Sequence, residues 1–589
     1  MRKAVYSFLF IGALTLGGCT LPKMVKMSKD QNLTVTPKPL EVHKDTVTFD
    51  MAANLPVKML KKGTAYTLNT YYKYGDKELA LEPIAFKAED FPNSATEQPK
   101  VTKTFSFPYN PAMSRGTLEV EGVASKGSKT KNSPRMQVAT GIVTTSKLVK
   151  PVYYASYAEH GYNNQEELAP IVIPDFIFEQ GKSVLRKTEI KSPKGQQLDA
   201  FIASKNATRT VTVTGTHSPE GAERINSKLS PDRAAAIERF YREEMKKYDY
   251  KGKADSIKFI LKPVIQDWSE FKVALGNYDG ISSDEKSEFL NIANGGGSFE
   301  EQEKRMQKLP TYKEVFKEIY PILRTAKTEI LTVKEKKTDA EISVLAKQVT
   351  QGKAQADALT FEEMMYGATL TPSLEEKAAI YEAATKKGTS WNAHNNLGAV
   401  YIAQAIENPA NLASLADKAL AQLQIAVKLK ETPEVNANLA SVYMMKGNPY
   451  AAYNYSKKAG GLSGDNAAGL NGVKGASEIY LAKYADAVRS ESAAADNAEN
   501  LFNKGLAQIL TKDYQNALTS FKEAISKNSN YAPAYYGAAI ASARLDKSDD
   551  VVSNLTNAVK ADPSLKDNAL SDIEFEKWQT TDQFRNALK

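Results

Sequence analysis

The side chains that could carry out chemistry are few and widely separated in this 589-residue chain. There is one cysteine, Cys19, and the four histidines are His43, His160, His217 and His394. The histidines lie in four different predicted contexts, no two have the spacing of metal ligands, and no second thiol is available. No GxSxG, phosphate-loop or GxGxxG motif is placed for catalysis. We therefore predict that the protein is not an enzyme and holds no metal or cofactor.

Cys19 follows a short leader. A basic start, the apolar run Ala4 to Leu16 and two glycines precede it, which predicts a secretory signal peptide over residues 1–18. The apolar run is too short to cross the ~30 Å hydrocarbon core of a bilayer. No later segment is apolar for the ~18 residues that a membrane span needs. The sequence therefore predicts a secreted chain rather than one that spans a membrane.

The residues at the end of the leader, Leu16-Gly17-Gly18-Cys19, resemble the bacterial lipobox. The resemblance implies that a peptidase cuts before Cys19 and that its thiol carries diacylglycerol, so Cys19 would be a lipidation site. Thr20 comes next and the following stretch is basic, which resembles neither an inner-membrane retention signal nor the acidic cluster of surface-displayed lipoproteins. We expect a lipid anchor in the outer membrane, with the body of the protein on the periplasmic side.

Composition is that of an ordinary globular protein. Hydrophobic residues make up 42% and charged residues 25% of the chain, and the length predicts about three to five domains. The net charge of +8 is modest, and no block of Lys and Arg is interleaved with aromatic residues. We therefore do not expect nucleic acid as a partner.

Two patterns divide the first part of the chain. Residues 19–44 are polar and contain Pro37 and Pro39, which is typical of a tether. Residues 45–160 contain short alternating runs, such as 66–72 and 117–123, separated by turn residues. Evenly spaced short strands predict an all-β sandwich.

From about residue 170 the pattern changes to strands alternating with helices. Strands are predicted near 176–178, 210–214, 257–261 and 328–333, and residues 264–324 are helical in pattern. This order predicts an α+β domain over residues 170–335 that contains a helical insertion, 264–324.

The turn after the second of these strands carries a motif. It reads GTHSPEG over residues 215–221, then Asn226, then LSPDRA over residues 229–234. This resembles the OmpA C-terminal, peptidoglycan-binding family, in which a loop Asp and a helix Arg grip diaminopimelate of the wall peptide. The resemblance implies a peptidoglycan site at Arg233, Ser218 and Asn226, although Ser218 replaces the Asp. Without that carboxylate the domain could instead be a docking module.

Residues 337–589 are helical and repetitive. Gly505, Ala517 and Phe521 form the best copy, and the next begins 34 residues later at Ala539. The period and the small residues resemble the tetratricopeptide repeat, with a C-terminal cap around Trp578. We predict an all-α solenoid whose concave face holds a protein partner.

The order of lipid anchor, sandwich, OmpA-like domain and repeat array resembles that of large envelope lipoproteins of Bacteroidota. Some of these belong to machines for outer-membrane protein assembly, type IX secretion or gliding. Two functions follow. One is a scaffold that binds a protein partner of an outer-membrane complex through its repeats. The other is a structural tether that joins the outer membrane to peptidoglycan.

Overall fold

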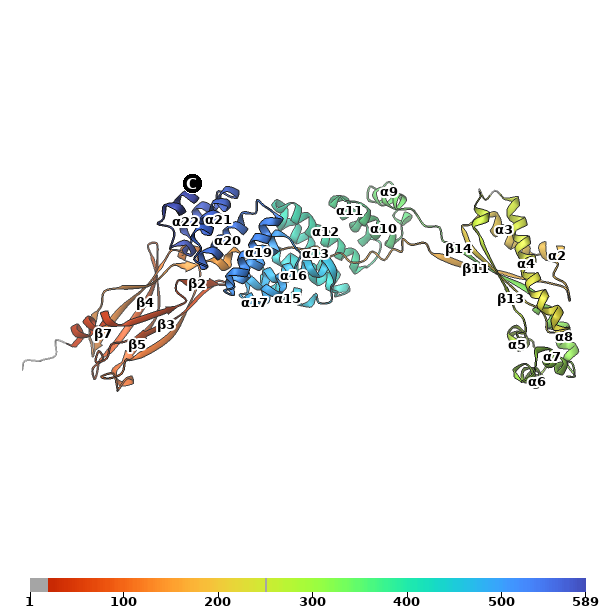
Figure 1. Cartoon of the computed structure of the whole chain (residues 1–589), viewed down its shortest axis with the longest axis horizontal. Coiled ribbons are helices and arrows are strands. Elements are labelled where there is room, and N and C mark those ends of the chain that lie inside the picture. Colours follow the sequence, from red (N-terminus) through yellow and green to blue (C-terminus); the bar gives the residue numbers. More distant parts are fainter. Residues whose placement is uncertain (1–19, 249, 251) are drawn as a thin grey trace, which may run out of the picture. The chain divides into compact units, whose positions relative to one another are not determined.

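The computed structural model describes residues 20–248, 250 and 252–589, and these form two compact units (Figure 1). The first unit is built from two separate stretches of chain, up to Tyr162 and from Asp339 onward. The second unit is the stretch between them, Asn163–Thr338. The predicted lipidation site, Cys19, lies outside the described residues.

Ten strands of the first unit form two sheets that share one core. Strand β3 pairs with β1, β2 and β6, and β7 pairs with β4, β8 and β9. The ring of Tyr72 on β4 lies 5.2 Å from that of Phe107 on β6, so side chains of the two sheets interdigitate. The prediction of an N-terminal β-rich domain is confirmed. The strands are β1 (Asn32–Thr36), β2 (Leu40–His43), β3 (Thr46–Asn54), β4 (Ala65–Tyr74), β5 (Lys77–Lys87), β6 (Lys100–Pro108), β7 (Thr117–Lys126), β8 (Lys129–Asn132), β9 (Met136–Thr140) and β10 (Ile142–Val143).

The prediction that residues 19–44 form a tether is wrong for residues 20–44. They fold as α1 (Thr20–Met27), β1 and β2. Met24, Leu40 and Val42 are each at most 1% exposed. The apolar side chains lie among polar residues and prolines, but each fills a place in the sandwich core, and their burial holds this segment against it.

The second unit is a four-stranded sheet with helices. The strand order is β11-β14-β12-β13, and only β12 and β13 run parallel. Helices α3 and α4 pack against the sheet over a core that includes Phe176, Ile237 and Val213. The elements are β11 (Leu168–Ile177), α2 (Lys187–Ile190), α3 (Pro193–Ala203), β12 (Thr208–Gly215), α4 (Glu223–Lys247), β13 (Lys258–Pro263) and β14 (Thr325–Val333).

A small helical subdomain lies between β13 and β14, as the sequence predicts. Trp268, Phe271 and Phe289 are central to its own core. Capping boxes at Ser282 and Ser298 begin two of its helices. The helices are α5 (Ser269–Gly276), α6 (Ser283–Asn294), α7 (Phe299–Met306) and α8 (Tyr312–Glu318).

The rest of the first unit is an array of helix pairs. Each first helix packs on its second helix and on the first helix of the next pair, so the first helices form one row. That row is α12, α14, α16, α18 and α20. The helices are α9 (Asp339–Thr350), α10 (Phe361–Gly367), α11 (Leu374–Thr385), α12 (Trp391–Glu407), α13 (Leu412–Leu429), α14 (Pro433–Met445), α15 (Pro449–Lys458), α16 (Gly464–Tyr480), α17 (Tyr484–Ser492), α18 (Ala498–Leu510), α19 (Tyr514–Lys527), α20 (Ala532–Arg544), α21 (Ser548–Ala561), α22 (Leu565–Ser571) and α23 (Asp582–Ala587).

The small residues of the repeat pattern lie where helices touch. A Cβ on Gly505 would lie 2.8 Å from the ring of Phe521, and one on Gly537 would lie 2.5 Å from it. Ala517 and Ala558 are fully buried in the same core. The predicted all-α array is therefore confirmed in its helix pairs and in its packing positions.

Candidate functional site

An extended segment of the chain lies along the row of first helices and is hydrogen-bonded to them. We call residues 149–162 the strap. They carry no helix or strand, and they follow the last strand of the sandwich after one short 3-10 helix, Thr145–Leu148. At one end of the strap, the side-chain amide of Asn503 on α18 accepts a hydrogen bond from the backbone N–H of Lys150 at 2.9 Å and donates one to its carbonyl at 2.8 Å. One side chain thus satisfies both backbone groups of one strap residue.

The same paired contact recurs along the strap. Asn438 on α14 accepts from the N–H of Ser156 at 2.7 Å and donates to its carbonyl at 2.7 Å. Asn396 on α12 makes the same two bonds with Ala158, at 2.7 and 2.9 Å. In an extended chain the N–H and C=O of one residue project to the same side, so an amide, which has a donor beside an acceptor, fits them as a pair.

A hydroxyl makes the equivalent contact between these positions. Ser441 accepts from the N–H of Tyr154 at 3.0 Å and donates to its carbonyl at 2.7 Å. The Tyr154 phenol and the Ser156 hydroxyl both donate to Asn466 on α16, at 3.0 and 3.1 Å. The clamped residues, 150, 154, 156 and 158, are all even-numbered and so share one side of an extended chain.

The clamping positions repeat within the array. Asn396, Asn438 and Asn503 are each the sixth residue of their helix. In α16 the sixth residue is Gly469, and a Cβ there would lie 2.1 Å from the ring of Tyr154. The ring therefore occupies the space that a side chain would fill. Strap numbers rise from 150 to 158 as helix numbers fall from α18 to α12, so the strap runs opposite to the array.

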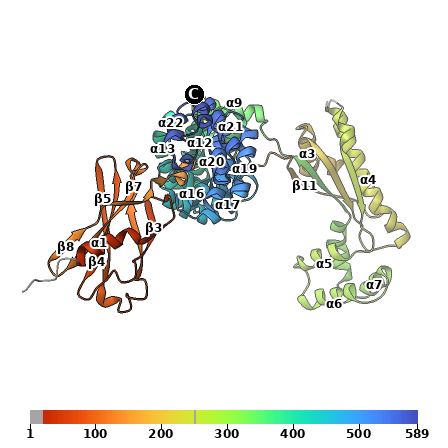
Figure 2. The ribbon, with the colours of Figure 1, turned by 60° about the vertical axis from the view of Figure 1, so that its left-hand side comes forward.

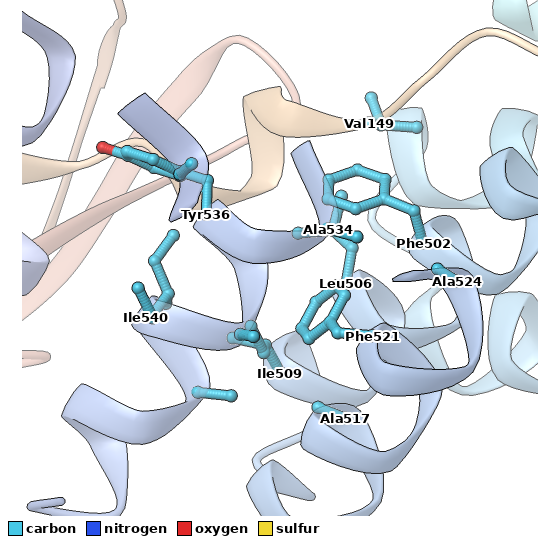
Figure 3. Close-up of a cluster of buried hydrophobic side chains, with 14 of the residues drawn as sticks. Val149, Phe502, Leu506, Ile509, Ala517, Phe521, Ala524, Ala534, Tyr536 and Ile540 are labelled. Atoms are coloured by element: carbon cyan, nitrogen blue, oxygen red, sulfur yellow. The ribbon is translucent and has the colours of Figure 1, made fainter. Parts of the chain in front are cut away.

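Apolar side chains of the strap extend the cores of the array. Val149 lies beside Phe502 in the cluster that also holds Phe521 (Figure 3). Tyr157 packs into the core formed by α9 to α12, and the ring of Tyr162 stacks on Tyr366 at 5.0 Å. Burial raises the pKa of the Tyr157 phenol. The strap is thus held both through its backbone groups and through its aromatic rings.

The sequence predicts that the concave face of the array holds a protein partner, whereas the row of first helices holds the strap of the same chain. The sequence indicates a sandwich over residues 45–160, whereas its last strand, β10, ends at Val143. The strap contains Val and Tyr residues, which are types that are frequent in strands. The strap does not join a sheet. Its backbone groups pair with side chains of the array.

A second set of contacts joins the sandwich to the array. Arg544 on α20 contacts Glu574 at 2.6 and 2.9 Å and lies 3.5 Å from Glu41 on β2. His43 makes a 2.7 Å hydrogen bond with the phenol of Tyr484 on α17. The hydrogen bond between His43 and Glu41 is the main cause that lowers the pKa of Glu41. Partly buried polar contacts of this kind favour one docking geometry within the unit.

In the second unit, the three residues of the predicted peptidoglycan site lie around one loop, residues 216–222. Arg233 on α4 is 1% exposed. Its guanidinium donates to the carbonyls of Thr216 at 2.7 Å, Lys182 at 3.1 Å and Glu179 at 3.3 Å. Burial, and then the nearby charge of Arg324, lower its pKa to about 10. Its donors are engaged by the fold itself.

The other two residues are also buried, Ser218 in this loop and Asn226 at the start of α4. Ser218 accepts a hydrogen bond from Arg324 at 3.0 Å, and Asn226 donates to the carbonyl of Glu220 at 3.0 Å. The carboxylate of Glu220 pairs with Arg324 at 2.8 Å. The sequence analysis did not identify Arg324. Its only signal in the sequence is its position directly before the last strand.

The helical subdomain packs against the same loop. The ring of His217 meets that of Phe299 edge-to-face at 5.9 Å. Burial lowers the pKa of His217. In this subdomain the buried carboxylate of Glu303 accepts hydrogen bonds from the phenols of Tyr312, at 2.6 Å, and of Tyr320. The insertion therefore covers one side of the motif.

The remaining chemistry is sparse in the part of the chain that the structure describes. There, no three His, Cys, Asp or Glu side chains gather as metal ligands. Among the described helices, none has the length and apolar character needed to cross a membrane.

Comparison with known proteins gives similarities for the helical array. No protein-family model matches the chain, and no curated protein matches it. Among solved structures, MamA is 19% identical over 26% of this chain and 90% of its own, with a TM-score of 0.23. The C-terminal part of a TPR repeat-containing protein from Cytophaga hutchinsonii is 15% identical over 39% of this chain and 92% of its own, with a TM-score of 0.28. YrrB, described as a TPR protein with an unusual peptide-binding site, is 18% identical over 38% of this chain and 96% of its own, with a TM-score of 0.21. The repeat architecture of this chain rests on its own helix pairs.

Proposed function

We propose that this protein is a non-enzymatic scaffold of the bacterial envelope, a lipoprotein anchored to the outer membrane through Cys19 and lying on its periplasmic side. The observation that carries the scaffold role is the strap. The array fixes the segment that leads from the sandwich to the second unit, with at least two hydrogen bonds to the backbone of each of Lys150, Tyr154, Ser156 and Ala158. The array thus holds another segment of its own chain in a fixed position.

A protein partner would then meet the outside of the array. Ile425 and Leu429 are each 42% exposed on α13, a second helix, and Tyr450 on α15 is 59% exposed. Residues four apart on a helix share one face, so Ile425 and Leu429 form an apolar pair. Exposed apolar groups of this kind suit a protein surface of an outer-membrane complex, such as one for protein assembly, type IX secretion or gliding.

Crosslinking of the native complex followed by mass spectrometry tests this assignment. We expect partner crosslinks on α13 and α15, and loss of the partner in the variant Ile425→Glu with Leu429→Glu. Val344→Glu, at a 55% exposed site on α9, is the matched control and should retain the partner. Partner crosslinks found only on the first helices, where the partner would have displaced the strap, would contradict the proposal.

The anchor is tested separately. Cys19→Ser should give a protein that is not acylated and no longer fractionates with outer membranes. Normal fractionation of that variant in the absence of a partner complex would exclude the lipid anchor.

The alternative is a structural tether to peptidoglycan through an OmpA-like second unit. The observation in its favour is that Arg233, Ser218 and Asn226 gather around one loop. Against it, Arg233 donates to three backbone carbonyls and Arg324 pairs with Glu220, so a wall peptide would have to displace both sets of contacts.

Co-sedimentation with purified sacculi distinguishes the two functions. Binding by the native chain that rises with Ser218→Asp and is lost with Arg233→Ala would favour the tether, provided that both variants keep the native melting temperature. No sedimentation by the native chain favours the scaffold.

A further inference from the structure

One end of the sandwich is rich in exposed lysines. Strand β3 begins at Thr46, where β2 and the contacts with the array lie, and ends at Asn54. The loop after Asn54 leads to β4, and β7 ends beside the start of β4, since Ser125 pairs with Ala65. The lysine-rich end is therefore the end of β3 that lies away from the array.

The β7–β8 hairpin directs three lysines to one side. Lys126 pairs with Lys129, and Ala124 pairs with Lys131. Directly paired residues, and residues two apart in a strand, project to the same face. Ala124 is fully buried in the sandwich core, so the three lysines continue the core face outward at the tip of the hairpin.

Helix α1 packs on that hairpin and adds more lysines. It contacts β7 and β8, and α1 and β8 lie together in Figure 2. Its Met24 enters the core that holds Ala124, whereas Lys23 and Lys26 are exposed. Together with the loops at this end, we define the lysine face as nine exposed residues: Lys23, Lys26, Lys29, Lys58, Lys61, Lys62, Lys126, Lys129 and Lys131.

The lysine face is not neutralised by neighbouring acids. Within the described chain, no carboxylate comes within 4.0 Å of the amino group of any of the nine lysines. Four exposed acids occupy the same end: Asp30, Glu89, Asp90 and Glu97. Nine positive charges against four negative leave an excess of five on a small, solvated surface, and such a surface attracts anions.

We propose that the lysine face is a docking surface for the phosphate headgroups of anionic lipids. The choice of a lipid surface rests on the proposed anchor, because Thr20 of α1 directly follows Cys19. An acyl chain on Cys19 would bring this end of the sandwich to the membrane, and the lysines would then meet headgroups. One lipid signal and a basic patch together hold a protein on a membrane more firmly than either alone.

The test uses the unacylated chain from Thr20 to Lys589, which contains every described element. Its binding to vesicles of phosphatidylcholine with phosphatidylglycerol is compared with its binding to pure phosphatidylcholine vesicles. We expect binding to the anionic vesicles only, weakened by salt. The variant Lys126→Gln, Lys129→Gln, Lys131→Gln should lower the partition coefficient about a hundredfold, which corresponds to about fivefold for each lysine.

A matched variant controls for loss of charge. Lys522→Gln, Lys560→Gln, Lys566→Gln removes three exposed lysines of the array and should bind as the unchanged chain does. Equal binding to neutral vesicles, no binding to anionic vesicles, or equal losses in both variants would overturn the proposal. Because the chain tested has no acyl group, these results are independent of whether Cys19 is lipidated, which the fractionation of Cys19→Ser reports.

Discussion

Asn438 spans the backbone of Ser156, 282 residues away in the chain, with its amide oxygen and nitrogen each 2.7 Å from their backbone partners. The nitrogen of Asn438 is also 2.9 Å from the side-chain oxygen of Asn395, whose own amide donates to the Ser156 carbonyl at 3.1 Å. All three residues are fully buried. A buried peptide group is costly unless it is paired, so this contact ties the strap to the array wherever both are folded.

Asn438→Asp tests the clamp with almost no change in shape. The carboxylate retains an acceptor for the Ser156 N–H but cannot donate to its carbonyl, and it introduces a buried charge. We expect a loss of about 2 kcal/mol or more in unfolding free energy and faster hydrogen exchange at residues 154–158. Asn557→Asp, at an exposed site of α21, should change neither. Unchanged exchange in the strap of Asn438→Asp would show that the clamp does not hold it.

Gly469→Ala tests the seat of Tyr154. Alanine favours a helix over glycine by about 0.5–1 kcal/mol, but its Cβ would lie 2.1 Å from the tyrosine ring. We expect a lower melting temperature, partly restored when Tyr154→Ala is added, because the smaller side chain removes the clash. Gly276→Ala has open space around it and should not be destabilising. If Tyr154→Ala lowers stability equally with and without Gly469→Ala, the two residues do not interact.

The buried carboxylate of Glu491 should make the stability of the array depend on pH. It is buried on α17, neither of its carboxylate oxygens has a hydrogen-bond partner in the described chain, and burial raises its pKa well above the usual 4.5. The nearby Glu478 adds to the shift. A raised pKa means that the folded state holds the proton more firmly than the unfolded state. This contribution to stability is complete below about pH 4.5 and is lost as the pH rises toward the folded pKa.

Glu491→Gln should therefore raise the melting temperature at neutral pH and reduce the fall in stability as the pH rises above about 4.5. Thermal unfolding at a series of pH values measures both. Glu499→Gln, at an exposed site of α18, is the control. A melting temperature at pH 7 that falls in Glu491→Gln would mean that the carboxylate is charged and stabilising.

Arg233→Lys tests whether the arginine serves the fold of the second unit. The planar guanidinium reaches three carbonyls from three nitrogens, and one ammonium cannot reproduce that fork. We expect a loss of about 2 kcal/mol or more in unfolding free energy, since buried carbonyls lose their donors. Arg239→Lys, exposed on the same helix, should be neutral. Equal stability of both variants would leave Arg233 free for a ligand.

Much of the fold could be predicted from the sequence because local patterns determine it. The short alternating runs, the strands near 176–178, 210–214, 257–261 and 328–333, and the small residues at Gly505, Ala517 and Ala558 all correspond to observed elements and contacts. Hydrophobic period and residue size act over a few residues, so one sequence suffices to read them.

The strap and its clamp could not be read in this way. Its backbone partners lie 238 to 353 residues away, and a local pattern does not reveal contacts between such distant residues. A signal was present nonetheless. Asn396, Asn438 and Asn503 each lie two residues before a small residue of the repeat, Gly398, Ala440 and Gly505. A polar amide repeated at a buried helix position indicates a ligand backbone, here that of the chain itself.

The pairing of Glu220 with Arg324 could not be predicted from the sequence for a similar reason. The two residues are 104 apart, and a helical subdomain separates them in sequence. Glu220 lies two residues after Ser218 in the loop, and tertiary contact gives its carboxylate a protein partner, Arg324. Local motif reading places the residues around the loop and does not reveal which of them are already paired.

The first unit is completed by two pieces of chain that flank the second unit, and this has a consequence for proteolysis. A protease that cuts between Asn163 and Thr338 would break the covalent connection between the sandwich with its strap and the array. The paired amide contacts and the buried rings of the strap would still join the two fragments, so they should leave a sizing column together in native buffer and separate only in denaturant. A nicked protein of this kind keeps its proposed anchor and its array in one particle, whatever becomes of the segment between them.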